Sequence, residues 1–233
     1  MPRPPTVSRF RYWLSYLWEQ SLEVTASEYN AYLEVCVVHG RLQLVAEEAI
    51  YSFGDYYLNF RRLFEHFNYA RLPERASVLV LGLGLGSIPE LLEKYVGVSY
   101  DYVAVEIDPV IIELASAYSL PALRSSVEVV EADARSFLQV DRRQYDLICV
   151  DVFQDATVPE HLNGEDFIAL CRARLLPGGA LVYNRLADSI PNRNAARAYF
   201  TGVFSPAFTA PYLYDTGGNY LLLNDGEFLT LPG

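Results

Sequence analysis

The sequence predicts an α/β protein with a doubly wound, mostly parallel seven-stranded sheet, a C-terminal antiparallel hairpin and a small N-terminal β-rich domain. Three observations predict this fold class. From residue 77 to 184, short apolar runs alternate with helical segments, which is typical of parallel strands covered by helices on both faces. Two strand-like runs flank a turn at residues 215–218. In the N-terminal part, apolar and polar residues partly alternate on both sides of His39 and Gly40.

The N-terminal elements are strands within residues 22–51. Partial alternation in 32–38 and 41–45 indicates half-buried strands, and His39-Gly40 supplies a tight turn between them. A helical segment over 55–68 and a proline-containing link follow. The predicted division is therefore a β-rich domain over 1–54, a helix and linker over 55–75, and an α/β domain over 76–233.

The α/β part repeats one unit, an apolar strand followed by a helix. Strands are expected over 77–82, 101–106, 126–131, 145–151 and 179–184, and helices over 87–95, 109–118, 134–139, 164–175 and 192–203. Asp108 followed by Pro109 is typical of a helix start, with an N-cap and a proline in the first turn. The final pair of strands, 212–214 and 220–223, closes the sheet as an antiparallel hairpin.

Composition excludes several function classes. The 233 residues are 52% hydrophobic, which suits a sizeable core and excludes a disordered chain. Acidic residues outnumber basic ones by 29 to 18, giving a net charge of −11. A binder of nucleic acid would need clustered cations, and an anionic membrane surface would repel this charge. We therefore expect no nucleic acid and no membrane among the partners.

The cysteines and the N-terminal segment indicate the compartment. The three cysteines are widely spaced, with no CxxC pair, which favours a reducing, cytoplasmic location. The N-terminal segment has a basic start but a broken apolar stretch, so we expect neither a signal peptide nor a membrane span. The three histidines are too scattered for a metal site, so we expect no metal. The aromatic residues of the first twenty positions are expected in the core or in a homodimer contact.

A glycine-rich turn is the first sign of a ligand site. Gly82, Gly84 and Gly86 follow a buried strand and precede a helix, where glycine lets the backbone turn sharply and approach a ligand. A dinucleotide-binding GxGxxG would need glycine at position 87, and this chain has Ser87. The spacing favours an adenosyl-type ligand over NAD. A plain βα turn is the structural alternative.

Acidic residues follow three predicted strands at the edge where α/β sheets bind ligands. Glu106 ends the second strand and suits the two hydroxyls of a ribose. Asp133 follows the third strand and is either a helix N-cap or a contact for an adenine amino group. Asp151 follows the apolar run Leu147-Ile148-Cys149-Val150, where a carboxylate has few structural reasons to stand.

Together these residues resemble the class I S-adenosylmethionine-dependent methyltransferases, and more specifically their spermidine synthase-like (aminopropyltransferase) branch. The branch is indicated by the β-rich N-terminal segment, by the strand that runs from Asp146 to Asp151, and by residues 158–162 with Phe167. The resemblance covers most of the chain. It implies a Rossmann-like methyltransferase fold, in which residues 76–233 form the S-adenosylmethionine-binding-type α/β domain.

The resemblance also implies roles for individual residues. Asp151 matches the catalytic aspartate, which deprotonates or holds an attacking amine. The ligand would be S-adenosylmethionine or decarboxylated S-adenosylmethionine, with methylthioadenosine as a product-like ligand, and the substrate a small-molecule amine. The other implied site residues are Gly82, Gly84 and Gly86 beside the nucleoside sulfonium, Glu106 at the ribose, Asp133 with the Ala134 backbone at the adenine, and Gln154 and Asp155 at the substrate.

Three interpretations of function stay open. The first is transfer of an aminopropyl or related alkyl group to a small amine. The second is S-adenosylmethionine-dependent methyl transfer. The third is a non-catalytic nucleotide-binding or assembly protein, which is suggested by Leu85 and Gln154 at positions where the resembled family carries aspartate.

Overall fold

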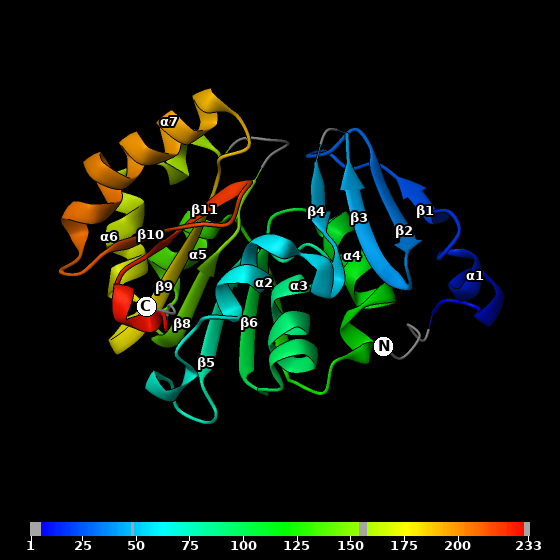
Figure 1. Ribbon diagram of the computed structural model, residues 1–233, viewed down its shortest axis with the longest axis horizontal. Helices are drawn as coiled ribbons and strands as arrows, with labels where there is room; N and C mark the ends of the chain where they lie inside the picture. Colours follow the sequence, from blue (N-terminus) through cyan, green and yellow to red (C-terminus); the bar gives the residue numbers. More distant parts are fainter. Residues whose placement is uncertain (1–5, 48, 154–157, 231–233) are drawn as a thin grey trace.

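The computed structural model describes residues 6–47, 49–153 and 158–230. The chain forms two sheets, a four-stranded one in the N-terminal part and a seven-stranded one in the rest (Figure 1). The predicted α/β class, the mostly parallel seven-stranded sheet and the C-terminal hairpin are confirmed. The domain boundaries at residues 54 and 75 stay a prediction.

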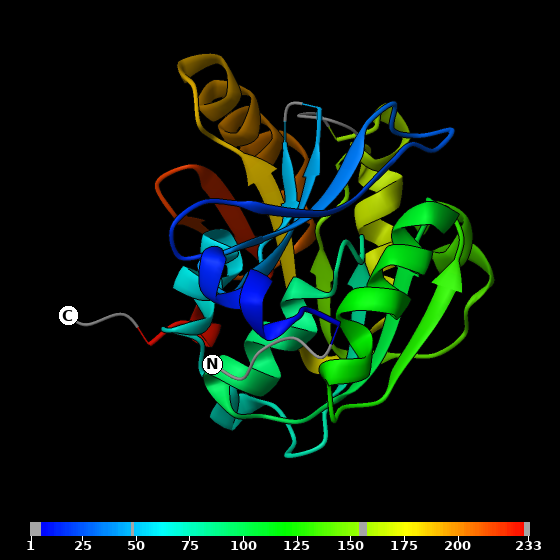
Figure 2. The same cartoon turned by 90° about the vertical axis from the view of Figure 1, so that its right-hand side faces the viewer.

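The N-terminal sheet is antiparallel throughout, and its strands face the viewer in Figure 2. Val38 pairs with Arg41, so His39 and Gly40 form a two-residue hairpin loop, and both have positive φ, at 49° and 76°. This is the backbone that a type I′ turn requires. The strands are β1 (Gln20–Thr25), β2 (Leu33–Val38), β3 (Arg41–Ala46) and β4 (Ile50–Ser52).

A short helix that the sequence analysis did not anticipate precedes this sheet. Ser8 caps α1 (Arg9–Leu14), because its hydroxyl accepts a hydrogen bond from the Arg11 N–H. Tyr12 packs against the core. Phe10 and Trp13 are 73% and 70% exposed, so of the two expected places for these aromatic residues, the core holds only part of the segment, and the homodimer contact stays a prediction.

The main sheet has the order β10-β11-β9-β8-β5-β6-β7. β5 and β8 are neighbouring parallel strands, and the strand order reverses between them. In sheets of this kind, ligands bind at the point where the strand order reverses. The pairs β11–β9 and β10–β11 are antiparallel. The strands are β5 (Ser77–Leu81), β6 (Asp101–Glu106), β7 (Val127–Glu131), β8 (Tyr145–Val150), β9 (Leu175–Leu186), β10 (Tyr212–Asp215) and β11 (Asn219–Leu223).

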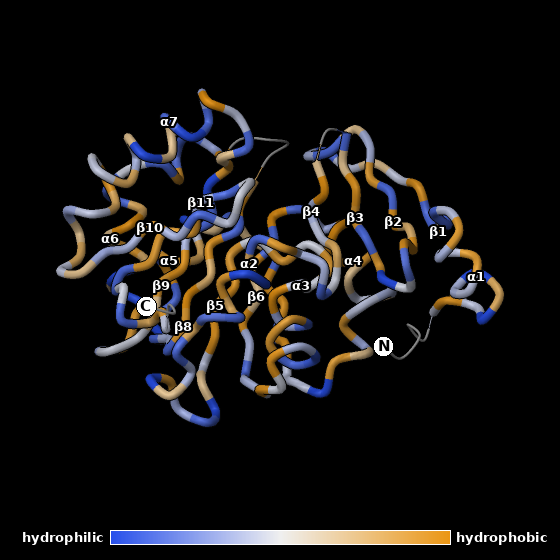
Figure 3. The backbone as a smooth tube through the Cα atoms, in the orientation of Figure 1, coloured by the Kyte–Doolittle hydropathy of each residue, from blue (hydrophilic) through white to orange (hydrophobic). Residues whose placement is uncertain are grey.

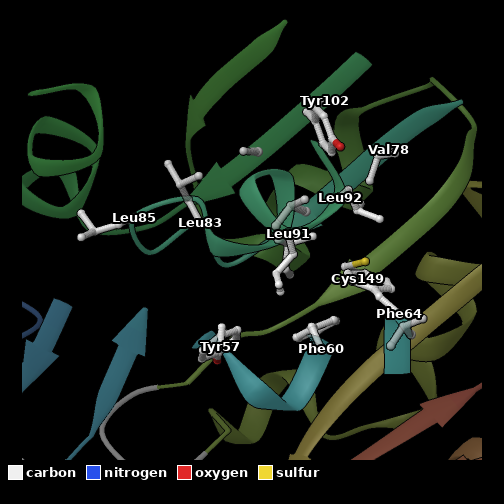
Figure 4. Packing of buried hydrophobic residues seen from close by; sticks show 14 of the residues in the cluster. Tyr57, Phe60, Phe64, Val78, Leu83, Leu85, Leu91, Leu92, Tyr102 and Cys149 are labelled. Carbon is white, nitrogen blue, oxygen red and sulfur yellow. The ribbon is translucent and has the colours of Figure 1, made fainter. Parts of the chain in front are cut away.

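Helices cover both faces of this sheet. One face packs against α2, α3 and α4, and the other against α5, α6 and α7. Figure 4 shows Phe60 and Phe64 of α2 in one cluster with Leu91 and with Cys149 of β8. The helices are α2 (Leu58–Phe64), α3 (Ser87–Glu90), α4 (Pro109–Tyr118), α5 (Ala134–Val140), α6 (Glu165–Ala173) and α7 (Ile190–Tyr199), with π-helical continuations at Leu91–Val96 and Phe200–Phe204.

Two boundaries differ from the sequence prediction. The helix expected over 55–68 is shorter, because Gly54–Tyr56 forms a separate 3₁₀ turn before α2 begins. The strand expected over 179–184 begins at Leu175, because the Pro-Gly-Gly segment stays within β9 as an irregularity opposite β8. The central strands β5 and β8 carry long hydrophobic stretches (Figure 3). Within the described ranges, no helix is long and apolar enough to cross a membrane.

Candidate functional site

A cavity of about 740 Å³ opens at the carboxyl ends of β5, β6 and β8. Tyr29, Asn30 and Tyr51 of the N-terminal part line it together with residues of the α/β part. The site therefore needs both sheets. Of the predicted site residues, the cavity brings together Gly82, Gly84, Glu106, Asp133, Ala134 and Asp151.

The glycine turn is crowded by its own fold. Gly82 has a φ of 91°, and a Cβ there would overlap the backbone carbonyl of Asp151. A Cβ on Gly84 would lie 3.1 Å from the Tyr51 carbonyl oxygen. Gly86 has a φ of 78° and starts α3, but it does not line the cavity. The turn therefore needs glycine for backbone packing, and two of its three glycines also border the cavity.

Ser87 explains why this turn departs from the dinucleotide pattern. Its hydroxyl oxygen lies 2.5 Å from the Ser52 hydroxyl and accepts a hydrogen bond from the Phe53 N–H at 3.1 Å. Ser52 ends β4. Ser87 stands where the dinucleotide-binding pattern has its third glycine, and its side chain links the N-terminal sheet to the glycine turn by hydrogen bonds.

Glu106 is bound by backbone amides from two segments. Its Oε2 accepts hydrogen bonds from the N–H groups of Leu83 at 3.0 Å and Gly84 at 3.4 Å, while Oε1 accepts from Ile107 at 2.9 Å and Asp108 at 3.2 Å. Burial raises the pKa of Glu106 above its ordinary value, although these four hydrogen bonds act in the opposite direction. The carboxylate is fixed at the cavity wall beside the glycine turn.

Asp108 holds the loop between β1 and β2 against the α/β part. Its Oδ1 accepts a hydrogen bond from the Val110 N–H at 2.9 Å, which confirms the predicted N-cap of α4. Its Oδ2 accepts from Asn30 Nδ2 at 2.7 Å and from the Ser27 hydroxyl. Asn30 Oδ1 in turn accepts from the Tyr51 hydroxyl at 2.9 Å. Two cavity-lining residues of the N-terminal part are thereby positioned by one carboxylate.

Asp133 serves as the N-cap of α5 and also lines the cavity. Its Oδ1 accepts a hydrogen bond from the Ser136 N–H at 2.8 Å, and its Oδ2 lies 2.7 Å from His161 Nε2. Burial opposes ionisation, but the hydrogen bonds from His161 and Ser136 hold the pKa of Asp133 below its ordinary value. The sequence analysis did not connect His161 with this carboxylate.

Asp151 follows β8 directly and lies in the cavity wall. Asn184 Nδ2 donates a hydrogen bond to Asp151 Oδ1 at 2.8 Å, and the Tyr57 hydroxyl lies near enough to the same carboxylate to influence its pKa. Burial raises the pKa of Asp151 to about 6, with a smaller contribution from the Glu106 charge, although Asn184 and Tyr57 both lower it. A carboxylate that titrates near neutrality suits proton transfer.

Three polar residues of this site were missed from sequence. Asn184 bonds Asp151, Asn219 bonds Asn184, and Tyr57 lies near the Asp151 carboxylate. Tyr57 and Asn219 also line the cavity. One signal was available for Asn184, a polar residue that directly follows the apolar run Leu181-Val182-Tyr183. Gln154 and Asp155, which the resemblance places at the substrate, lie outside the described residues.

The cavity is strongly acidic. Its lining holds one histidine and, among the residues that the structure describes, neither lysine nor arginine. No group of three or more potential metal ligands occurs in the described part of the chain. The acidic lining residues are Glu106, Asp108, Asp133, Asp151, Glu160 and Asp188. Such a lining attracts cations through the summed field of its carboxylates.

Comparison with protein families confirms the resemblance. The family model for the spermine/spermidine synthase domain matches residues 59–193, which is more than half of the chain. This segment holds the glycine turn, the three strand-end carboxylates and Asn184. The chain therefore belongs to the spermine/spermidine synthase domain family.

Curated relatives match about half of the chain. A probable polyamine aminopropyl transferase of Bifidobacterium longum is 36% identical over 109 residues, which are 46% of this chain and 24% of that protein. A polyamine aminopropyltransferase of Chromobacterium violaceum is 35% identical over 108 residues, or 46% and 41% of the two chains. An N-terminal histidine N-methyltransferase of Emericella nidulans is 35% identical over 119 residues, or 48% and 20%. The match thus spans less than half of each of these relatives.

Solved structures confirm the fold over a larger part of the chain. Spermidine synthase from Thermotoga maritima is similar with a TM-score of 0.66 at 18% identity, covering 88% of this chain and 72% of that one. Human methyltransferase-like protein 13 in complex with SAH has a TM-score of 0.52 at 24% identity, covering 70% and 73%. Both likenesses show that the Rossmann-like fold extends well beyond the segment matched by the family model.

Proposed function

We propose that this protein binds an adenosyl sulfonium nucleotide and transfers an aminopropyl or related alkyl group to a small-molecule amine. The observation that carries the proposal is the acidic cavity, which has six carboxylates and no lysine or arginine among its described lining residues. Both substrates of such a reaction are cations, a sulfonium and an amine. The family membership and the named aminopropyltransferase relatives support the same reaction class.

The charge of the cavity also favours one nucleotide over another. S-adenosylmethionine carries a carboxylate, which would face acidic residues without a basic side chain to pair with. Decarboxylated S-adenosylmethionine lacks that group and keeps its positive charges, so the field of the cavity favours it. We therefore propose decarboxylated S-adenosylmethionine as the donor, with methylthioadenosine as the product.

The residues of the cavity fit an adenosyl ligand. The backbone of Gly82 and Gly84 borders the cavity directly after β5. Glu106 already accepts four backbone hydrogen bonds, so we propose that it binds the ribose hydroxyls in place of the longest of them, the one from the Gly84 N–H at 3.4 Å. Asp133 and the Ala134 backbone are proposed to contact the adenine. No metal is needed, since a sulfonium supplies an alkyl carbon with a good leaving group when it is bound.

Asp151 is proposed as the base for the amine. A protonated amine has no lone pair for attack, so a nearby carboxylate must take its proton. With a pKa raised to about 6 by burial, Asp151 is ionised at neutral pH and still a competent proton acceptor. The new bond forms between the amine nitrogen and the alkyl carbon, the carbon–sulfur bond breaks, and the proton passes to Asp151. Gln154 and Asp155 stay proposed as substrate contacts on the resemblance alone.

Methyl transfer is the second candidate function. The relative from Emericella nidulans, named as an N-terminal histidine N-methyltransferase, is what favours it. In that reaction S-adenosylmethionine would be the donor, and the same residues would hold its adenosyl group. The two functions therefore differ in the donor that binds tightly, and a binding experiment separates them. A protein without catalysis would bind nucleotide but give no methylthioadenosine.

The proposal is tested by ligand binding followed by turnover. We expect decarboxylated S-adenosylmethionine and methylthioadenosine to raise the melting temperature, and NAD to leave it unchanged, because a ligand that binds only the folded state stabilises it. Glu106→Gln should abolish this shift, whereas Glu128→Gln on the exposed part of β7 should retain it. Methylthioadenosine release with 1,4-diaminobutane and n-butylamine then tests transfer. A shift with S-adenosylmethionine alone would replace the proposal by methyl transfer.

We also propose a cytoplasmic homodimer. The cytoplasmic location is supported by Cys36, Cys149 and Cys171, which are all free thiols in buried positions. A dimer contact is supported by Trp13 and Leu17, which are 70% and 75% exposed near α1. Sedimentation of the chain and of Trp13→Glu tests the dimer, since the charge should produce monomers. Fractionation of the native cells tests the location.

A further inference from the structure

On one face of the main sheet, buried apolar side chains of three neighbouring strands are followed by polar side chains near the cavity. On the face covered by α2, Cys149 of β8, Val182 of β9 and Leu221 of β11 are fully buried. Cys149 pairs with Val182, and Asn184 pairs with Leu221. Because side chains alternate along a strand, Asp151 and Asn184 lie on this same face, two residues further along. Asn219 joins them from β11, whose direction is opposite.

These three side chains form a directed chain of hydrogen bonds. Asn219 Nδ2 donates to Asn184 Oδ1 at 2.9 Å, and Asn184 Nδ2 donates to Asp151 Oδ1 at 2.8 Å. Asn184 is fully buried and Asn219 is 7% exposed. The bond from Asn219 fixes which end of the Asn184 amide faces the carboxylate, since the acceptor oxygen of that amide is already used.

Tyr57 approaches Asp151 from the segment that enters α2. Its hydroxyl helps to lower the pKa of the carboxylate, and its ring stacks on Phe60 with the centroids 6.1 Å apart (Figure 4). Tyr57 itself is only 7% exposed. Asp151 therefore interacts with Asn184 of β9 and with Tyr57 at the start of α2, and it also borders the cavity.

We propose that Asn184 and Asn219 are positioning residues that orient the Asp151 carboxylate toward the cavity. Burying two amides is unfavourable unless both are hydrogen-bonded, and apolar residues would fill this face at no such cost. The polar residues Asp151, Asn184 and Asn219 replace apolar ones at the end of the sheet that borders the cavity. A purely structural role does not explain this position. The inference rests on the proposed role of Asp151 as the base.

The titration of Asp151 reports this orientation without turnover. The titratable groups that act on Asp151 are Tyr57 from the start of α2 and Glu106 from β6, and Cys149 lies two residues before it in β8. Glu106 and burial raise the pKa of Asp151, while Asn184 and Tyr57 lower it. Removing the Asn184 amide should therefore raise the titration midpoint.

The experiment uses the full chain labelled with ¹³C at aspartate carboxyls. Asp151 is assigned as the signal lost in Asp151→Asn, and its chemical shift is followed against pH. We expect Asn184→Ala to raise the midpoint by about one pH unit or more, because a hydrogen bond to the charged form is lost. Asn219→Ala should raise it by less, since Asn184 remains but is no longer held.

Asn224→Ala is the matched control. Asn224 also bridges backbone of β9, because its Oδ1 accepts from the Leu181 N–H and its Nδ2 donates to the Gly179 carbonyl. It bonds neither Asp151 nor the two amides proposed to orient it, so its loss should loosen β9 and leave the Asp151 midpoint unchanged. A midpoint in Asn184→Ala within about 0.3 unit of the parent would overturn the proposal. An equal shift in Asn224→Ala would overturn it too.

The design separates this inference from the proposed function. If Asn184→Ala does not fold, Asn219→Ala carries the test, and an unchanged midpoint there contradicts the proposal. Absence of nucleotide binding or of methylthioadenosine release would instead contradict the proposed function, because the titration needs neither ligand nor turnover. With both intact, Asn219→Ala should reduce the rate of transfer by a larger factor than it weakens methylthioadenosine binding.

Discussion

His161 Nε2 lies 2.7 Å from Asp133 Oδ2, at the point where the cavity meets the start of α5. The other oxygen of Asp133 caps the helix through the Ser136 N–H. One carboxylate therefore joins a loop histidine, a helix N-terminus and the cavity wall. The N-cap that its position in the sequence suggests is confirmed, and Asp133 also lines the cavity, where its adenine contact stays a proposal.

Asp133→Ala should lower the free energy of unfolding by about 1 kcal/mol at pH 7, because the cap and the His161 contact are lost. The pKa of Asp133 is held below its ordinary value in the fold. Its contribution is therefore present above the unfolded pKa and lost as pH falls through the folded pKa. The difference between variant and parent should shrink below about pH 4. Urea denaturation at pH 7 and pH 3.5 measures this.

Asp133→Asn is the control for the cap, since asparagine caps helices as well as aspartate does. It should be more stable than Asp133→Ala at pH 7. Equal stability of the two variants would show that the cap contributes little here.

Gly82→Ala should destabilise the protein by more than about 3 kcal/mol, because strain at positive φ is joined by overlap with the Asp151 carbonyl. Gly97 offers a matched control, with a φ of 89° against 91° and no atom within 4 Å of an added Cβ. Gly97→Ala should cost only the strain, about 1 kcal/mol. Urea denaturation of both variants measures the difference, and equal losses would mean that crowding at Gly82 is relieved by small shifts.

The main sheet and the glycine turn could be predicted because their signals are local. Burial of β5 and β8 on both faces gives continuous apolar runs, and the turn after β5 needs three glycines with positive φ. The strand-end positions of Glu106, Asp133 and Asp151 follow from the same alternation. Each of these features can be recognised from about ten consecutive residues of the sequence.

The polar network around Asp151 could not be predicted, because it depends on long-range register. Asn184 and Asp151 are 33 residues apart and meet only through the pairing of β8 with β9. The contact between His161 and Asp133 spans 28 residues and a loop. The Tyr57 contact requires the packing of α2 on the sheet. Contacts between residues so far apart in the sequence produce no local pattern from which they could be predicted.

Arg41→Ala should destabilise the protein by about 3 kcal/mol, because it leaves the buried Asp55 carboxylate without its partner. Arg41 Nε lies 2.6 Å from Asp55 Oδ1, Asp55 is 2% exposed, and the guanidinium stacks 3.6 Å above the Tyr56 ring. Asp55→Ala should cost less, and the double variant less than the sum. A double-mutant cycle by urea denaturation measures the coupling, and simple additivity would contradict it.

Asp55 does not line the cavity, although it is a carboxylate close to Tyr57 in the sequence. Asp55→Asn should therefore leave methylthioadenosine affinity within about twofold of the parent, measured by calorimetry. A large loss of affinity together with unchanged stability would show that Asp55 acts at the site.

Asp151→Asn should be more stable than the parent at pH 8, and most of this difference should disappear by pH 4. Burial raises the pKa of Asp151 from 3.8 to about 6. A raised carboxylate pKa contributes stability that is complete below the unfolded pKa and is lost as pH rises through the folded one. The loss is about 3 kcal/mol for a shift of this size, and asparagine does not titrate. Urea denaturation between pH 4 and pH 8 measures the divergence.

Asp188→Asn is the control, since it removes an exposed carboxylate of the same cavity and should change stability by less than about 0.5 kcal/mol. If Asp151→Asn gains stability and loses methylthioadenosine release, the carboxylate is kept at a cost to the fold, as expected for a group that performs chemistry. Parallel stability curves for Asp151→Asn and the parent would show that Asp151 is not perturbed. The argument for it as a base near neutral pH would then fail.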